Sequence, residues 1–353
     1  MNRHIPQLDG LRAIAILLVL LTHFWKYPEG YPLLNLVAQF GWVGVDLFFV
    51  LSGFLITGIL IRTREDQRYF ANFYARRSLR IFPIYILLLL LVFVVLPQFS
   101  TLPDRVNDDK YLYFFYLSNV ALAAGGWQLF LLDITWTLSV EEQFYIIWPF
   151  LVKVLNQRWL ARLCVVLILL VPFVRWFVWN EFGWMWTYMM TPLRADAFAF
   201  GAIVAIVGHQ QLRRLAIYCL YVGFPLLMWL VLTGSYKRDS LLVATGGYTL
   251  NALVAAASLV LVLGHRKGLL STLTMRHIGK VSYGMYIYHP LCLVAASFLL
   301  HTGDGIAGSL IQLLVVSFLT IGVASISFYV FEIPFLQLKR RFASAANNKK
   351  TAR

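Results

Sequence analysis

Two ionisable side chains, Arg12 and His23, lie in or beside the first long apolar stretch of the sequence, residues 11–24. An ionisable residue inside a membrane helix usually marks a functional site, because its burial in lipid is costly. Eleven residues make about three helical turns, so both side chains would lie on one face, about 16 Å apart along the axis. One helix would therefore hold a cation near its start and an imidazole near its far end. The alternative is a signal anchor in which His23 lies by chance at the interface.

Two arginines, Arg77 and Arg80, lie in a basic segment, residues 74–83, that leads into the third long apolar stretch. If a helix has begun there, side chains three residues apart are neighbours on one face and can hold a phosphate from two sides. The alternative is a basic loop that anchors to lipid headgroups.

Three carboxylates, Asp46, Glu141 and Glu142, fall within or beside apolar stretches, where each needs a partner or water. A carboxylate beside His23 would orient the imidazole and raise its basicity, and the sequence leaves open whether Asp46 or Glu142 does so. Adjacent residues point about 100° apart on a helix, so Glu141 and Glu142 cannot share one task. We expect one of them to face the site and the other to cap its helix.

Polar residues also mark two later apolar stretches. Arg194 and Asp196 are two residues apart, so on a helix they point to different sides and each is expected to find a partner elsewhere. Ser282, Tyr286 and His289 share one helix face, which we place in the half nearer the cytoplasm. This stripe could line a donor channel; a histidine satisfied by a neighbouring helix is the alternative.

Composition identifies the class of protein that must position these residues. Of 353 residues, 60% are hydrophobic and 13% are charged, whereas about a quarter of a soluble domain is charged. The chain is therefore expected to be an all-α polytopic membrane protein. Ten candidate spans of sufficient length appear at 10–28, 39–61, 79–97, 137–156, 159–179, 193–208, 213–233, 241–264, 281–301 and 309–335.

The distribution of charge predicts orientation. Most of the 30 Lys and Arg residues fall in segments that are cytoplasmic if both termini are cytoplasmic. The net charge of +14 then reflects topology and attraction to anionic lipids and phosphorylated ligands, and no nucleic-acid partner is expected. The three cysteines form no CxxC pair, so neither a metal site nor a disulfide framework is predicted.

Several of these segments together resemble one family. Residues 8–15 with 22–24, 41–54, 74–83, 135–145 and 193–201 resemble motifs of the acyltransferase-3 family of integral membrane acyltransferases, and the resemblance covers nearly the whole chain. One departure is Thr137, where the family motif usually has Ser. The resemblance implies that the Arg77–Arg80 pair binds the phosphates of an acyl-coenzyme A.

The resemblance and the polar residues together predict a membrane O-acyltransferase in the bacterial inner membrane. It would move an acyl group, expected to be acetyl, from cytoplasmic acyl-coenzyme A to a hydroxyl of a lipid-linked or polymeric saccharide. Acetyl-coenzyme A would be a co-substrate, and no tightly bound cofactor is expected. In this hypothesis His23 is the general base, and Asp46 or Glu142 orients it. Donor-side residues would be Arg12, Arg77, Arg80, Ser282, Tyr286 and His289, with Glu141, Arg194 and Asp196 toward the acceptor or structural.

Some alternatives stay open at this level. Attack on the thioester could be direct or pass through an acyl-enzyme, and a homo-oligomer is neither required nor excluded. A transporter or exporter is the competing class, although no inverted repeat is evident. We expect one membrane domain, residues 1–340, followed by a disordered basic cytoplasmic tail, residues 341–353.

Overall fold

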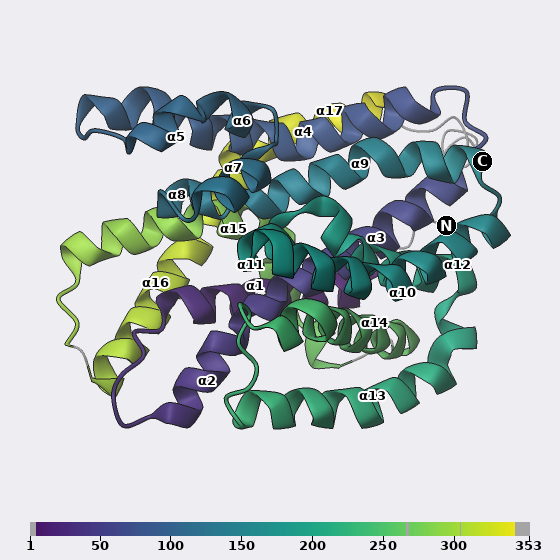
Figure 1. The fold of residues 1–353 in the computed structure, drawn as a ribbon. Coiled ribbons are helices and arrows are strands. Elements are labelled where there is room, and N and C mark those ends of the chain that lie inside the picture. Colours follow the sequence, from purple (N-terminus) through teal and green to yellow (C-terminus); the bar gives the residue numbers. More distant parts are fainter. Residues whose placement is uncertain (1–4, 266–267, 304, 343–353) are drawn as a thin grey trace.

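The computed structural model describes residues 5–265, 268–303 and 305–342, and all regular secondary structure within these ranges is helical (Figure 1). Seven described segments are long and apolar enough to cross a membrane. They are Pro6–Phe24, Pro32–Thr63, Tyr69–Gln98, Gln157–Phe182, His209–Leu232, Val243–Gly264 and Ile306–Leu338. The all-helical membrane class is thus confirmed.

The other three predicted spans also form helices, but each differs from an uninterrupted apolar span. Helix α9 (Trp136–Val154) carries Glu141, Glu142 and Lys153, and α12 (Ala195–Val207) has only 13 residues. Helix α15 (Leu273–Leu299) has 27 residues and carries the polar stripe of Ser282, Tyr286 and His289 in its middle. Ser282, Tyr286 and His289 are buried inside the bundle rather than facing lipid.

The bounds of the remaining helices show how the spans are connected. The long helices are α1 (Pro6–Phe24), α3 (Gly44–Thr63), α4 (Tyr69–Leu90), α10 (Gln157–Phe182), α13 (His209–Leu232), α14 (Tyr248–Gly264) and α16 (Ile306–Ser327). The short helices are α2 (Pro32–Phe40), α5 (Asp104–Asp108), α6 (Lys110–Phe114), α7 (Ser118–Gly125), α8 (Phe130–Asp133), α11 (Trp184–Met189) and α17 (Ile333–Leu338). Figure 1 shows α5, α6, α7 and α8 grouped together beside one end of α9.

Three helices begin earlier than the hydropathy pattern predicts. Helix α1 starts at Pro6, a residue suited to the first turn, and α4 starts at Tyr69. Helix α15 starts at Leu273, after Thr272 caps it by accepting from the backbone N–H of Met275. The polar first turns of these helices hid their true starts. At the other end, residues 341–342 of the predicted tail belong to a 3₁₀ turn, and residues 343–353 lie outside the described residues.

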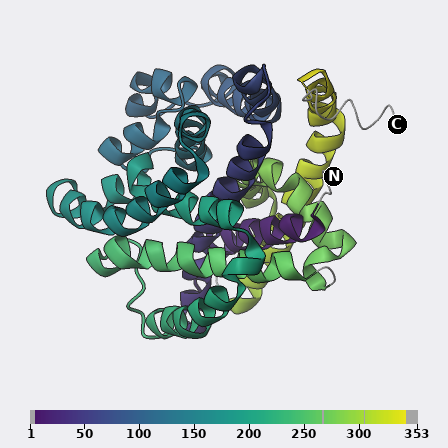
Figure 2. The same cartoon turned by 90° about the vertical axis from the view of Figure 1, so that its right-hand side faces the viewer.

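Helix α1 lies at the centre of the bundle. Figure 2 shows it, in purple, in the middle of the assembly, where it packs between α3 and α15. Glycines allow these close approaches: a Cβ at Gly44 would collide with the backbone of Ala15, and one at Gly279 with the backbone of Asp9. Helices α3 and α12 cross in the same way through Gly53 and Gly201.

The outer helices have the opposite character. On α10, α13 and α16, large apolar side chains point away from the protein, among them Phe173, Tyr221 and Phe318. A continuous apolar surface of this kind requires lipid rather than water around it. The central helices can therefore hold polar groups because the outer ones shield them.

Candidate active site

His23 lies in the last turn of α1 and lines a cavity of about 310 Å³, here called the His23 cavity. Its Nδ1 lies 2.8 Å from the backbone oxygen of Val19. Because a carbonyl oxygen only accepts a hydrogen bond, this contact puts a proton on Nδ1 and leaves the lone pair of the neutral ring on Nε2. A backbone carbonyl, and not a carboxylate, therefore orients the imidazole.

His289 packs against His23, with 4.9 Å between the ring centroids and the two rings tilted by 48°. It is fully buried, and its Nδ1 lies 2.7 Å from the backbone oxygen of Tyr286. The prediction that His289 lies in the cytoplasmic half with Ser282 is therefore wrong. Because α15 begins at Leu273, His289 is 16 residues into the helix, about 24 Å along the axis, which brings it to the depth of His23.

Aromatic rings and two opposite charges complete the His23 cavity. Its lining includes Trp42, Trp127, Phe130, Asp133, Trp136, Tyr188 and Arg238. Asp133 ends α8, and its Oδ1 accepts hydrogen bonds from the backbone N–H groups of Gln128 and Leu129 at 3.0 and 3.1 Å. Burial raises the pKa of the Asp133 carboxyl, and these two hydrogen bonds oppose the rise. Both donors use Oδ1, so Oδ2 has no hydrogen bond within the described part of the chain.

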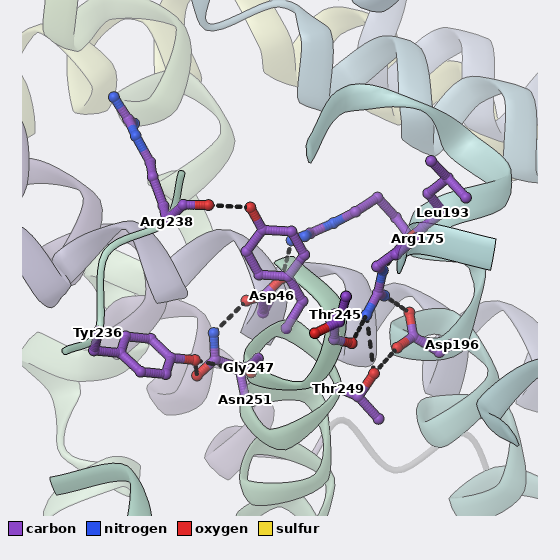
Figure 3. A network of polar contacts seen from close by, with 12 residues as sticks. Asp46, Arg175, Leu193, Asp196, Tyr236, Arg238, Thr245, Gly247, Thr249 and Asn251 are labelled. Carbon is purple, nitrogen blue, oxygen red and sulfur yellow. Dashed lines mark hydrogen bonds and ion pairs between the residues drawn. The ribbon is translucent and has the colours of Figure 1, made fainter. Parts of the chain in front are cut away.

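Asp46 was a candidate to orient His23, and the structure contradicts that pairing. Its carboxylate forms a buried ion pair with Arg194 and accepts a hydrogen bond from the side chain of Asn251 at 2.8 Å (Figure 3). Val45, the preceding residue, is the one that lines the His23 cavity. Because successive residues on a helix point about 100° apart, Asp46 faces α12 and α14 instead.

Asp196 pairs with Arg175 from α10, and Thr249 donates a hydrogen bond to it at 2.6 Å (Figure 3). The expectation that Arg194 and Asp196 each find a partner on another helix is thus confirmed. Arg175 is fully buried and escaped the sequence analysis, although a lone arginine inside a predicted span is itself a signal. Removing one partner of such a pair leaves an uncompensated buried charge, so the network fixes α3, α10, α12 and α14 together.

This charge network also supports one wall of the His23 cavity. The guanidinium of Arg194 lies 5.2 Å from the ring centre of Tyr188 and 4.5 Å from that of Tyr248. Tyr188 lines the cavity. Arg194 and Asp46 therefore act on the cavity through the rings they position, without entering it.

A second cavity, here called the arginine cavity, has a volume of about 80 Å³. Its lining includes Arg12 from α1, Arg77 and Arg80 from α4, and Ser282 from α15. Arg77 and Arg80 lie inside α4, which meets the condition under which they are neighbours on one face. Arg12 lies 3.6 Å from Asp9, its partner one turn earlier in α1.

Glu141, rather than Glu142, lines the arginine cavity. Its carboxylate accepts hydrogen bonds from Ser52 at 2.6 Å and from Tyr145 at 3.0 Å. Neither glutamate caps α9, because that helix begins at Trp136, five residues before Glu141. The proposed pairing of Glu142 with His23 is also wrong: Glu142 is six residues beyond Trp136, about 9 Å further along α9 than the lining of the His23 cavity.

A third cavity, here called the basic cavity, has a volume of about 160 Å³. Its charged lining includes Arg76, Arg77, Arg80 and Lys339. Burial and the positive charges of three neighbouring arginines lower the pKa of Lys339 to about 7. Lys339 comes from beyond α17, far from the arginines in the sequence, so no local pattern could have predicted its position here.

The three cavities follow one another through shared walls. Arg77 and Arg80 line both the basic and the arginine cavities. Val45 and Tyr286 line both the arginine and the His23 cavities. Two hydrogen bonds hold Tyr286 there. Its hydroxyl accepts one from the hydroxyl of Thr137 at 2.8 Å and donates one to the backbone oxygen of Ile134 at 3.1 Å. The three cavities therefore adjoin one another, in a series here called the path, from a cluster of cations to the half-buried imidazole of His23, against which His289 packs.

The described residues contain no group of three or more His, Cys, Asp and Glu side chains that could hold a metal ion. The side chains that line the three cavities include imidazole, guanidinium, hydroxyl and carboxylate groups.

Comparison with known proteins identifies the family of this chain. Residues 5–330 match the model of an acyltransferase domain. Peptidoglycan O-acetyltransferase OatA of Listeria monocytogenes is 27% identical over 367 residues, which covers 94% of this chain and 56% of the relative. YrhL of Bacillus subtilis, named provisionally as a peptidoglycan O-acetyltransferase, is 30% identical over 374 residues, which covers 94% of this chain and 55% of the relative.

The chain thus spans about half the length of these curated relatives. No solved structure matches it. The family match extends over nearly all the described helices, including both imidazoles and the arginines of α1 and α4. The chain belongs to the acyltransferase-3 family of membrane acyltransferases.

Proposed function

We propose that this protein transfers an acetyl group from cytoplasmic acetyl-coenzyme A to a hydroxyl of a cell-envelope saccharide. The observation that carries the proposal is the series of three cavities, which joins a cationic cluster to His23 through shared walls. The names of the relatives supply the class of acyl group and acceptor: OatA is named as a peptidoglycan O-acetyltransferase, and YrhL is named so provisionally.

The donor end of the path is suited to the phosphates of coenzyme A. Arg76 and Lys339 line the basic cavity, and Arg77 and Arg80 stand between it and the arginine cavity. Guanidinium groups form charge-assisted, often bidentate hydrogen bonds with phosphate oxygens. A donor held there would extend its narrow pantetheine arm through the arginine cavity, past Tyr286, toward the imidazoles.

The chemical step takes place in the His23 cavity. The acceptor hydroxyl gives its proton to Nε2 of His23 while its oxygen attacks the thioester carbon. Collapse of the tetrahedral intermediate forms the ester, breaks the carbon–sulfur bond and releases the coenzyme A thiolate, which takes the proton from Nε2 of His23 and so restores the neutral base. Direct transfer needs no acyl-enzyme, and the neutral ring with its proton on Nδ1 is the form of the base that this step requires.

The test is acetyl transfer by the purified full chain in lipid nanodiscs. The protein is incubated with acetyl-coenzyme A and soluble peptidoglycan fragments, and both thiol release and a mass increase of one acetyl group on the fragment are measured. We expect wild-type activity and, for His23→Ala, a loss of about 10²- to 10⁴-fold, the usual contribution of a general base. His301→Ala, which changes an exposed histidine, is the matched control and should remain active.

Each alternative result has a definite meaning. If His23→Ala keeps activity within threefold of wild type, His23 is not the base. If the wild-type protein neither consumes acetyl-coenzyme A nor acetylates a fragment, the acyltransferase proposal fails and the transporter alternative gains support.

A further inference from the structure

Arg238 is the cation of the His23 cavity, and the described structure gives it no carboxylate partner. Its guanidinium lies among three aromatic rings, 5.6 Å from the centre of Trp127, 5.6 Å from that of Trp184 and 5.9 Å from that of Tyr188. Cation–π contacts hold the plane of the group but leave N–H donors free for a ligand. A guanidinium fork in such a setting is suited to a carboxylate or a phosphate.

Hydrogen bonds to α14 and to the residues just before it hold the loop that carries Arg238. The hydroxyl of Tyr248 donates a hydrogen bond to the backbone oxygen of Arg238. The hydroxyl of Tyr236 lies 2.8 Å from the backbone oxygen of Gly247 and 2.7 Å from Oδ1 of Asn251. The side-chain amide of Asn251 in turn donates a hydrogen bond to the carboxylate of Asp46 in the buried charge network. Figure 3 shows the side chain of Arg238 directed away from that network. The loop is therefore held in place before any ligand binds, which lowers the cost of binding.

The rest of the cavity is suited to a single sugar ring. Its volume of about 310 Å³ lies at the lower end of the range for small-molecule sites, about 300–1,000 Å³. Trp127, Trp136 and Tyr188 supply apolar faces, and Asp133 keeps Oδ2 available to accept a hydrogen bond from a hydroxyl. His23 lines the same cavity.

We propose that the acceptor is an anionic sugar and that Arg238 binds its carboxylate or phosphate, which places a hydroxyl of the ring at Nε2 of His23. The inference rests on the proposed acetyl transfer and narrows its substrate class. It also gives Arg238 a role in specificity that is separate from the acid–base chemistry. A neutral sugar of the same size would leave the guanidinium without an anionic partner and would bind more weakly.

The experiment measures binding without any donor, so that it does not depend on acetyl transfer. Three probes are titrated into the purified full chain in neutral-lipid nanodiscs by calorimetry: N-acetylglucosamine, N-acetylmuramic acid and N-acetylglucosamine 1-phosphate. We expect an anionic probe to bind wild-type protein at least about tenfold more tightly than the neutral one, as a charge-assisted contact implies. The carboxylate and phosphate arms distinguish the two kinds of anion.

Variants separate Arg238 from general electrostatics and from folding. Arg238→Gln should bind all three probes equally, and Arg238→Lys should keep part of the preference, because lysine is a cation without the fork. Lys237→Gln removes an exposed neighbouring charge outside the cavity lining and should keep the full preference. A thermal unfolding measurement on each variant, compared with that on the wild-type protein, checks that the variant is folded.

Two outcomes would overturn the inference: equal affinity of wild-type protein for all three probes, or an undiminished preference in folded Arg238→Gln. Failure of the proposed function looks different. In that case the preference for an anionic sugar would persist in the binding assay while acetyl-coenzyme A is not consumed.

Discussion

Replacement of Arg80 by alanine tests the donor end of the path most directly. Arg80 lines both the basic and the arginine cavities, so its guanidinium stands where a phosphate would be held between them. Arg77, one turn earlier on α4, lines the same two cavities and remains in the variant. Arg80→Ala should therefore weaken donor binding without abolishing it.

The size of the effect follows from the type of contact. A hydrogen bond to a charged group contributes about 1.5–3 kcal/mol, which corresponds to about a 10- to 150-fold increase in dissociation constant. Arg80→Lys should recover only part of this loss, because an ammonium group cannot form the bidentate contact. Raising the salt from 0.1 to 1 M shortens the Debye length from about 10 to about 3 Å, so it should weaken wild-type binding more than that of the variant.

The assay is titration of acetyl-coenzyme A into purified protein at both salt concentrations. Arg158→Ala is the control, because Arg158 is exposed in the first turn of α10 and lines none of the three cavities. Equal dissociation constants for wild type and Arg80→Ala at low and high salt would refute the donor assignment. The arginines would then be interpreted as a lipid anchor and topology signal.

Three further predictions concern the frame and the pH dependence. Asp46→Asn leaves Arg194 buried without a counter-charge and should lower the free energy of unfolding by about 3–5 kcal/mol, measured by thermal unfolding in detergent. Gly201→Ala places a Cβ against the backbone of Val50 and should cost about 1–3 kcal/mol in the same assay, whereas Gly322→Ala meets nothing within 4 Å and should be neutral. Lys339, with a pKa of about 7, is mostly charged at pH 6 and mostly neutral at pH 8. Lys339→Met should therefore weaken acetyl-coenzyme A binding at pH 6 and change it little at pH 8, and a constant ratio of the two dissociation constants would contradict this.

The sequence predicts the elements of this protein better than their contacts. Apolar stretches of spanning length reveal the long helices because each must be apolar enough for lipid by itself. The same rule misjudges where α1, α4 and α15 begin, because their first turns are polar and extend beyond the apolar stretch. A shift of eight residues in α15 is enough to move His289 from the predicted donor half to the side of His23.

Pairing of charges is the part that the sequence could not resolve. Both Asp46 and Glu142 were chemically suitable partners for His23, and spacing within one helix says nothing about which way a neighbouring helix turns. The crossing of α3 and α12 at Gly53 and Gly201 is a tertiary feature, and it directs Asp46 toward Arg194. Asp133 and Arg238 lie in short connecting segments without a periodic signal, so their place in the His23 cavity needed the fold.

The actual partners of Asp46 have a consequence for the mechanism. A histidine oriented by a backbone carbonyl gains no negative charge from its orienting group, so in the proposed reaction the imidazolium of His23 would need stabilisation from elsewhere. Among the described residues that line the His23 cavity, Asp133 is the one carboxylate. Arg238, in the same lining, would oppose that positive charge unless an anion of the acceptor neutralises it. An anionic acceptor would therefore both bind Arg238 and favour proton transfer to His23, which joins substrate recognition to the chemical step.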